Sequence, residues 1–166
     1  DEREFGHIDQ SAVAMGVLIH PAFLSERANV IAITRDVFDP TRSDIYYLNA
    51  QAGEASVANP APGVATEQLV YHYRYIPGTP ELERKSASSL NHSEPVLTLR
   101  DARHIGCYIT AIHDHFRNLI DPMHTDRWFA MDVEIKLVGD DRAVVVKQAR
   151  PYAFGRAERP ADCREF

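Results

Sequence analysis

Apolar residues occur along the chain in short runs that polar and proline-containing segments separate. The first run is continuous and ends at His20-Pro21, where proline removes a backbone hydrogen-bond donor. Later runs are rich in β-branched and aromatic residues, which favour strands. The pattern predicts strands at residues 12–19, 28–34, 44–50 and 69–75. Two intervening segments, residues 52–65 and 77–95, read as loops, the second of them crossing the surface.

A different periodicity follows Thr98. Apolar residues then recur at steps of three and four, which is typical of one face of a helix. Thr98 is suited to the N-cap position with Asp101 three residues later, and Asp121-Pro122 ends the pattern. We therefore expect a helix over residues 99–120 with an apolar face made of Ala102, Ile105, Ile109, Ile112, Phe116 and Leu119.

The last predicted feature is a β-hairpin. Two apolar-rich strands, residues 128–137 and 142–149, flank the turn sequence Val138-Gly139-Asp140-Asp141. Trp128 and Phe129 precede the acidic part of the first strand and are expected to anchor the core. The expected fold class is α+β, with a mostly antiparallel sheet, one long helix and a C-terminal hairpin. Residues 1–152 form the domain, and residues 153–166 are a polar tail or linker.

The hairpin carries the candidate chemistry. Because side chains alternate along a strand, Asp132 and Glu134 share one face of its first strand, and Gln148 and Arg150 share one face of its second. If the register aligns these faces, carboxylate and amide oxygens suited to Mg²⁺ meet a guanidinium suited to phosphate. A half-exposed hairpin shows the same alternation without any function, so a merely solvated face is the competing interpretation.

Composition narrows the possible functions. The chain has 166 residues, of which 45% are hydrophobic and 25% charged, and its net charge is −6. This acidic balance argues against nucleic acid or a membrane surface as a partner, and the chain shows no apolar run of about 20 residues. Cys107 and Cys163 lie far apart and are expected to be free thiols in a cytoplasmic protein. His113 and His115 are two apart on the helix and cannot bind one metal as an i,i+4 pair would.

Residues 131–151 resemble the end of the ATP-grasp domain of the pyruvate phosphate dikinase and phosphoenolpyruvate synthase family. That family ends this domain with a D-x-E strand, a short turn and a strand closing in Q-x-R or Q-A-R-P. Three further segments are similar to family segments and follow in the same order, at residues 13–23, 30–40 and 47–59. The matching residues of the C-terminal motif are Asp132, Glu134, Gln148, Arg150 and Pro151.

The resemblance implies that ATP and Mg²⁺ bind here. Glu134 and Gln148 would be metal ligands, with Asp132 supporting them. Arg150 would be the catalytic residue that contacts the phosphates and stabilises the transferring group. The remaining nucleotide contacts would come from the backbone of a hinge that presents hydrogen bonds to adenine and from one carboxylate near the nucleotide, namely Ile19, His20, Ala22 and Glu54.

The resemblance also implies a fragment. The family's N-terminal ATP-grasp lobe and its phosphohistidine domain are not recognisable here, so we expect the isolated chain to be inactive. In the parent enzyme, ATP would phosphorylate a histidine of the partner domain on the way to pyruvate or a related acceptor. The alternative is a catalytically degenerate nucleotide-binding or regulatory module of the same fold. The altered hinge and the missing N-terminal lobe favour that alternative. Pro21 within the hinge and Asn29, where the family has glycine, depart from the family pattern and bear on the geometry of adenine binding rather than on the fold.

Overall fold

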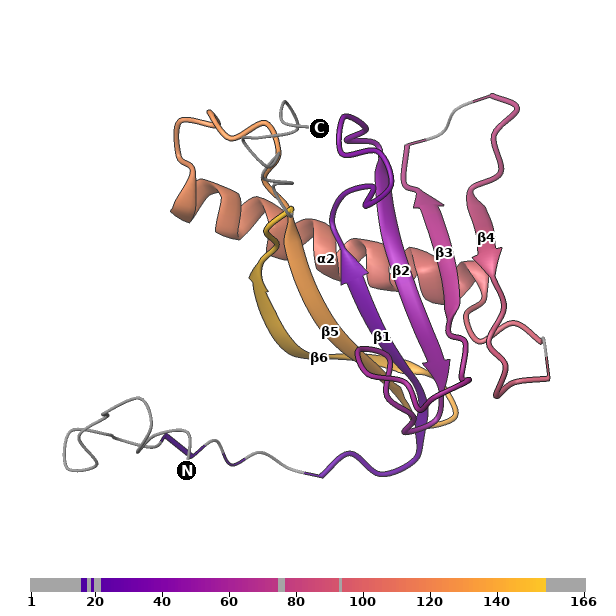
Figure 1. The fold of residues 1–166 in the computed structure, drawn as a ribbon. Helices are drawn as coiled ribbons and strands as arrows, with labels where there is room; N and C mark the ends of the chain where they lie inside the picture. The colour runs from indigo at the N-terminus through magenta and orange to yellow at the C-terminus, as the bar shows by residue number, and fades with distance from the viewer. Residues whose placement is uncertain (1–15, 18, 20–21, 75–76, 93, 155–166) are drawn as a thin grey trace, which may run out of the picture.

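The computed structural model describes residues 16, 17, 19, 22–74, 77–92 and 94–154 of the chain. Within them, six strands form one sheet and a single long helix crosses it (Figure 1). The elements in chain order are β1 (Glu26–Ile33), β2 (Ile45–Ala52), β3 (Glu67–His72), β4 (Leu82–Ser86), α2 (Leu99–Ile120), β5 (Met131–Val138) and β6 (Ala143–Pro151).

The sheet has the strand order β4-β3-β2-β1-β5-β6, and every neighbouring pair is antiparallel. The first four strands form a meander, and α2 then returns the chain so that β5 pairs with β1. Helix α2 lies behind the sheet in Figure 1 and covers one of its faces. The α+β class, the mostly antiparallel sheet, the long helix and the final hairpin are therefore confirmed.

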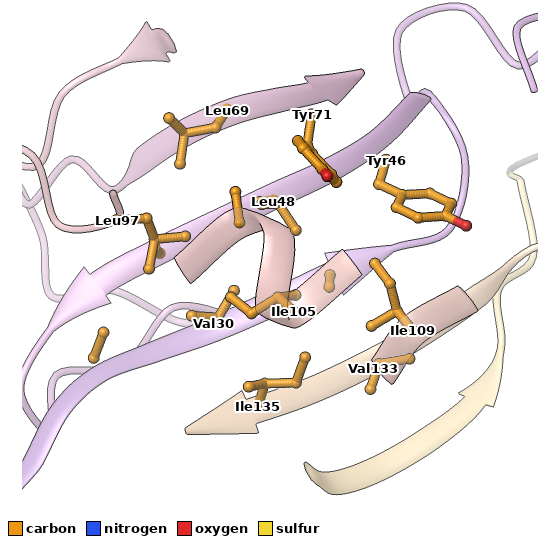
Figure 2. Close-up of a cluster of buried hydrophobic side chains, with 14 of the residues drawn as sticks. Val30, Tyr46, Leu48, Leu69, Tyr71, Leu97, Ile105, Ile109, Val133 and Ile135 are labelled. Atoms are coloured by element: carbon orange, nitrogen blue, oxygen red, sulfur yellow. The ribbon is translucent and has the colours of Figure 1, made fainter. Parts of the chain in front are cut away.

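The hydrophobic core lies between the sheet and α2. Ile105 and Ile109 of the helix are completely buried, and Figure 2 shows them over the inward side chains of the strands. Gly106 permits this close approach, because a Cβ atom there would lie 2.6 Å from Cε1 of Tyr71. The buried strand residues of this cluster include Val30, Leu48, Leu69, Met131, Val133, Ile135 and Leu137.

The helix prediction is confirmed at both ends. Thr98 and Asp101 form a reciprocal capping box, and Asp121 is the C-cap residue. Of the predicted apolar face, the first three residues are buried and the next two pack partly against the core. Leu119 was wrongly assigned to that face, since it is 68% exposed where the helix extends past the sheet.

Strand β4 was missed and lies inside the segment predicted as a surface loop. Its sequence, LERKS, has almost no apolar pattern, because it forms an edge of the sheet and needs only backbone pairing with β3. The predicted strand at residues 12–19 falls mostly outside the described residues. Residues 16, 17 and 19, which are described, do not belong to a strand.

A buried carboxylate on β3 fixes the segment that leads into the helix. Glu67 has no exposed surface and accepts hydrogen bonds from the backbone N–H groups of Val96 at 3.0 Å and Leu97 at 2.9 Å. The Arg84 Nε atom lies 3.0 Å from the other carboxylate oxygen. Since two backbone donors and a cation neutralise one buried charge, Glu67 sets where α2 begins relative to the sheet.

The hairpin turn is tied to the same end of α2. Arg142 Nε donates to Asp101 at 3.0 Å, and Arg142 Nη2 donates to the carbonyl oxygen of Val96 at 2.7 Å. Burial alone raises the pKa of Asp101, but the hydrogen bonds from Arg142 and Thr98 outweigh it and hold that pKa below its usual value. The hairpin is thus fastened to the helix through its turn as well as through the core.

Replacing Glu67 with alanine should destabilise the fold by about 3 kcal/mol, because two charge-assisted hydrogen bonds from buried backbone donors are lost. Urea unfolding followed by circular dichroism measures the change. Glu83→Ala is the matched control, because Glu83 pairs with Lys85 on β4 with both side chains about 40% exposed and should change stability by less than about 1 kcal/mol. Equal effects of the two variants would contradict this role for Glu67.

His113 links the middle of α2 to the ends of β1 and β5. Its Nδ1 atom lies 2.7 Å from Thr34 Oγ1, and Thr34 Oγ1 in turn accepts a hydrogen bond from the Met131 backbone N–H at 2.8 Å. The ring also packs edge-on against Phe129. His113 therefore has a packing role between the helix and the sheet.

The surroundings of His113 favour its neutral form. Burial lowers its pKa from the usual 6.5 and outweighs Asp114, which raises it. The positive charges of Arg117 and Arg35 lower the pKa further. The unfolded chain therefore takes up a proton at this residue before the folded chain does as pH falls through about 6.5, and His113 contributes a loss of stability on acidification.

The His113→Gln variant should lose less stability than the wild type between pH 7.5 and pH 5.5, because it removes this proton uptake while glutamine can still bond Thr34. Guanidinium unfolding midpoints measured across that range test the difference. His115→Gln is the control, since His115 is exposed on the same helix. The expectation fails if wild type, His113→Gln and His115→Gln show the same pH dependence.

Candidate functional site

The candidate site lies on the sheet face opposite α2, which we call the open face. Strand alternation sends apolar side chains toward the helix and leaves polar ones on this face. The part of this face that carries the candidate residues is formed by β2, β1, β5 and the edge strand β6, in that order. The polar residues that alternation places there include Asn29, Asn49, Asp132, Glu134, Lys136, Gln148 and Arg150.

The hairpin register brings the predicted residues into two opposed pairs. Asp132 lies directly across from Arg150, and Glu134 lies directly across from Gln148. The predicted alignment of the two polar faces is therefore confirmed. Residues paired across antiparallel strands have Cβ atoms about 5 Å apart, close enough for their side chains to act on one ligand.

Asp132 holds Arg150 in place. Arg150 Nε and Nη2 lie 2.9 Å and 2.8 Å from the same oxygen, Asp132 Oδ2. The Asp132 side chain is 10% exposed, whereas that of Arg150 is 62% exposed. The Asp132 carboxylate raises the pKa of Arg150, so the guanidinium is a positive charge whose orientation is fixed by Asp132.

Glu134 and Gln148 differ from this pair because their side chains are not engaged. Within the described part of the chain, neither side chain makes a hydrogen bond, and Glu134 makes no ion pair within 4.0 Å. Glu134 is half-buried and Gln148 is exposed. A carboxylate and an amide oxygen thus face each other across one register position with their lone pairs available.

A pocket of about 250 Å³ opens beside Glu134. We call it the β5 pocket. The predicted residues Glu54 and Glu134 both line this pocket, although they are 80 positions apart in sequence. The polar residues lining it are Asn29, Glu54, Ser56, Glu134, Lys136 and Lys147.

Asn29 positions the loop that carries Glu54. Its Nδ2 atom donates to the carbonyl oxygens of Gly53 at 3.3 Å and Ala55 at 3.2 Å. Gly53 has φ of 62°, a left-handed conformation that turns the chain at the end of β2. Asn29, which stands where the resembling family has glycine, therefore tethers this loop over the open face.

Two lysines complete the pocket, and the sequence reasoning missed both. Lys136 follows Glu134 by two residues on β5 and forms an ion pair with Glu26, with side chains 14% and 5% exposed. Lys147 is the additional residue of a β-bulge, since Glu134 pairs with Gln148 while Ile135 pairs with Val146. The bulge sends Lys147 to the β5 pocket, and within the described residues Lys147 makes no ion pair.

The predicted adenine hinge is not tested by the structure. Ile19 is 89% exposed and Ala22 is exposed, and neither lines the β5 pocket, while His20 lies outside the described residues. The expectation for Phe129 is confirmed, because it is 5% exposed and belongs to the core. The expectation for Trp128 is wrong: it is half-buried and lines a different pocket.

The donor set suits a magnesium ion bound together with phosphate better than a metal held by protein alone. No group of three or more His, Cys, Asp or Glu side chains gathers anywhere in the described residues. Mg²⁺ is commonly held by one or two protein oxygens, with waters and substrate phosphates completing its octahedron. The free Glu134 and Gln148 oxygens fit that mode. Asp132 binds Arg150 through Oδ2, and its Oδ1 atom is buried without a hydrogen-bond partner among the described residues.

Comparison of the chain with protein-family models and with curated proteins finds no match. Among the described residues, no helix combines the length and apolar character needed to cross a membrane. The open face is therefore described by its geometry and by the resemblance of residues 131–151 to the C-terminal motif of the family.

Breaking the Glu26–Lys136 pair should destabilise the fold although the pair lies near the ends of β1 and β5. Glu26→Ala leaves the nearly buried Lys136 ammonium without a carboxylate partner and should destabilise the fold by about 3 kcal/mol. The double variant Glu26→Ala/Lys136→Met removes the unpaired charge and should recover most of that loss. Chemical unfolding of the single and double variants measures both steps.

Arg27→Ala is the control for this cycle. Arg27 is adjacent in sequence and pairs with Asp140, but their side chains are 48% and 94% exposed. Its loss should change the free energy of unfolding by less than about 1 kcal/mol. A Glu26→Ala variant no less stable than Arg27→Ala would show that Lys136 does not depend on its partner.

Proposed function

We propose that the open face binds Mg·ATP and that the chain is the C-terminal lobe of an ATP-grasp domain of the pyruvate phosphate dikinase and phosphoenolpyruvate synthase type. The parent enzyme would phosphorylate a histidine of a partner domain on the way to pyruvate or a related acceptor. The observation that carries the proposal is the hairpin register, which opposes Glu134 to Gln148 and Asp132 to Arg150 on a face that α2 does not cover.

Glu134 and Gln148 are the residues that would hold the metal. Their oxygens come from adjacent strands, so the sheet fixes their separation and only side-chain rotation is needed to reach one ion. Bound there, Mg²⁺ would bridge phosphate oxygens and reduce their negative charge. Glu54, in the same pocket, adds a second carboxylate that can accept hydrogen bonds from water bound to the metal.

Arg150 and Lys147 are the residues that would bind phosphate. Arg150 presents a guanidinium whose orientation is fixed by Asp132, so little side-chain entropy is lost when it donates to a phosphate. Lys147 contributes a second positive charge that no carboxylate in the described residues neutralises. Placed on one side of the metal site, these cations would stabilise charge on a transferring phosphoryl group.

The exposure of these side chains supports a site shared with another lobe. Lys147, Gln148 and Arg150 are all exposed, and the β5 pocket is open to solvent on its outer side. Nucleotide sites normally bury most of the ligand between two walls. A second lobe facing the open face would supply the missing wall, and the chain alone would bind Mg·ATP weakly.

Calorimetric titration of the parent protein with Mg·ATP tests this proposal. Glu134→Gln and Arg150→Gln should each weaken binding about tenfold or more, because each removes a charged partner of the metal or the phosphates. The Glu134→Gln effect should depend on Mg²⁺, whereas the Arg150→Gln effect should persist with ATP in the presence of a chelator.

Glu94→Gln is the control for charge alone, since Glu94 is exposed in a loop and does not line the β5 pocket. It should bind Mg·ATP as the wild type does. A folded wild type that does not bind Mg·ATP, or binding that both site variants leave unchanged, would reject the nucleotide site and favour the degenerate module.

A further inference from the structure

A second pocket, of about 200 Å³, lies beyond the end of β1. It is lined by two arginines, the tryptophan, a threonine and a proline, which are Arg35, Arg127, Trp128, Thr41 and Pro40. The pocket joins the loop after β1 to the loop before β5. No carboxylate lines it. Two guanidinium groups thus share one small cavity in a chain whose net charge is −6.

Arg35 forms the inner wall and is 5% exposed. Its Nη1 atom donates to the Pro40 carbonyl oxygen at 2.8 Å, and its Nε atom lies 3.5 Å from the Phe129 carbonyl oxygen. These partners are neutral, and no carboxylate of the described residues pairs with Arg35 within 4.0 Å. A buried guanidinium held only by neutral groups is costly unless an anion compensates it.

Burial and neighbouring charges also act on the pKa of the Arg35 guanidinium. Burial lowers the pKa of Arg35, and the positive charge of Arg117 lowers it further. Arg117 itself has a buried Nε atom without a hydrogen-bond partner among the described residues. Asp126 and Tyr73 act in the opposite direction and raise the pKa of Arg35. Asp126 does not come within ion-pair distance of Arg35, so no carboxylate of the described residues is a direct partner of this guanidinium.

Arg127 and Trp128 form the outer wall. The Arg127 guanidinium carbon lies 5.0 Å from the centre of the Trp128 ring, a cation–π contact that supports the exposed arginine over the pocket. Arg127 also has no ion pair within the described residues. Its planar fork and that of Arg35 are the groups that bind tetrahedral and planar oxyanions through paired hydrogen bonds.

We propose that this arginine pocket binds a phosphate group, as the free dianion or as a phosphate monoester, between Arg35 and Arg127. Phosphate is favoured over a monoanion because the two guanidinium groups that line the cavity match two negative charges. Phosphate binding would also give the buried Arg35 the counter-charge that the described residues do not provide.

The arginine pocket is distinct from the β5 pocket and lies beyond the end of β1 that is nearer to Asp132 and Arg150. Ile33 pairs with Asp132, and Asp132 pairs with Arg150, while Arg35 follows Ile33 by two residues. None of the residues of the arginine pocket lines the β5 pocket. Phosphate binding here does not require Mg²⁺ or ATP, so its test is independent of the proposed function.

Fluorescence provides a direct test because Trp128 is the single tryptophan of the chain. The chain is titrated with inorganic phosphate at pH 7.5, without magnesium or nucleotide and at constant ionic strength set with chloride. The expected result is a saturable change in tryptophan emission as phosphate displaces the Arg127 guanidinium from the ring. Acetate, titrated in the same way, should give a response at least tenfold weaker because it carries one charge.

Three variants make the test specific. Arg127→Gln should weaken phosphate binding about tenfold or more and is expected to fold, since Arg127 is exposed. Arg35→Gln should do the same, and circular dichroism shows whether it remains folded. Arg74→Gln is the matched control, because Arg74 lies over the Tyr73 ring but does not line the pocket; its titration should equal that of the wild type.

A linear response that chloride reproduces, or a folded Arg127→Gln variant that titrates as the wild type does, would overturn the proposal. Acetate binding as strong as phosphate binding would also overturn it, because the site would then not select a dianion. A phosphomonoester such as glycerol phosphate distinguishes the two sources of the group. If both free phosphate and the ester saturate the response, the pocket accepts a phosphate monoester. If free phosphate alone saturates it, the pocket has room only for the free dianion.

Discussion

The burial of one face of β5, between β1 and β6 in an antiparallel sheet, is the constraint on which the rest of the structure depends. Its inward residues, Met131, Val133, Ile135 and Leu137, are all buried against the core under α2. A shift of one residue would place four apolar side chains in solvent and two carboxylates in the core. Burial of this stripe therefore fixes Asp132 and Glu134 on the open face, and pairing with β6 brings Gln148 and Arg150 to them.

Elements with strong periodicity could be predicted from the sequence, and elements defined by their neighbours could not. Helix α2 combines an apolar stripe with a capping box, so its bounds follow from local chemistry. The hairpin was recognisable from its alternation and turn. Strand β4 has no such signal, because a charged edge strand is stabilised by backbone bonds to β3 rather than by its own side chains. Leu119 follows the helical stripe but extends beyond the sheet that would bury it.

The residues of the candidate site also divide into those that strand periodicity predicts and those that depend on neighbouring segments. The opposition of Asp132 to Arg150 and of Glu134 to Gln148 follows from period-two alternation once the turn is placed. The position of Lys147 does not follow, because a bulge breaks that alternation. The signal in the sequence was the spacing of Val146 and Ala149, which both pack inward although they are three positions apart rather than two or four. The sequence could not predict that Asn29 binds the loop after β2 or that Trp128 lies beside two arginines. Both arrangements depend on contacts between segments that are distant in sequence.

The central claim is that one metal–nucleotide occupies the open face beside Glu134 and Gln148. Paramagnetic relaxation by Mn·ATP tests it most directly, with backbone amides of the isotopically labelled chain observed by NMR in the parent protein. The account predicts strong broadening of the Glu134 and Gln148 amides, weaker broadening at Glu54, and none at Tyr108 on the exposed side of α2. Broadening centred elsewhere, or sharp signals at Glu134 and Gln148 with Mn·ATP bound, would contradict it.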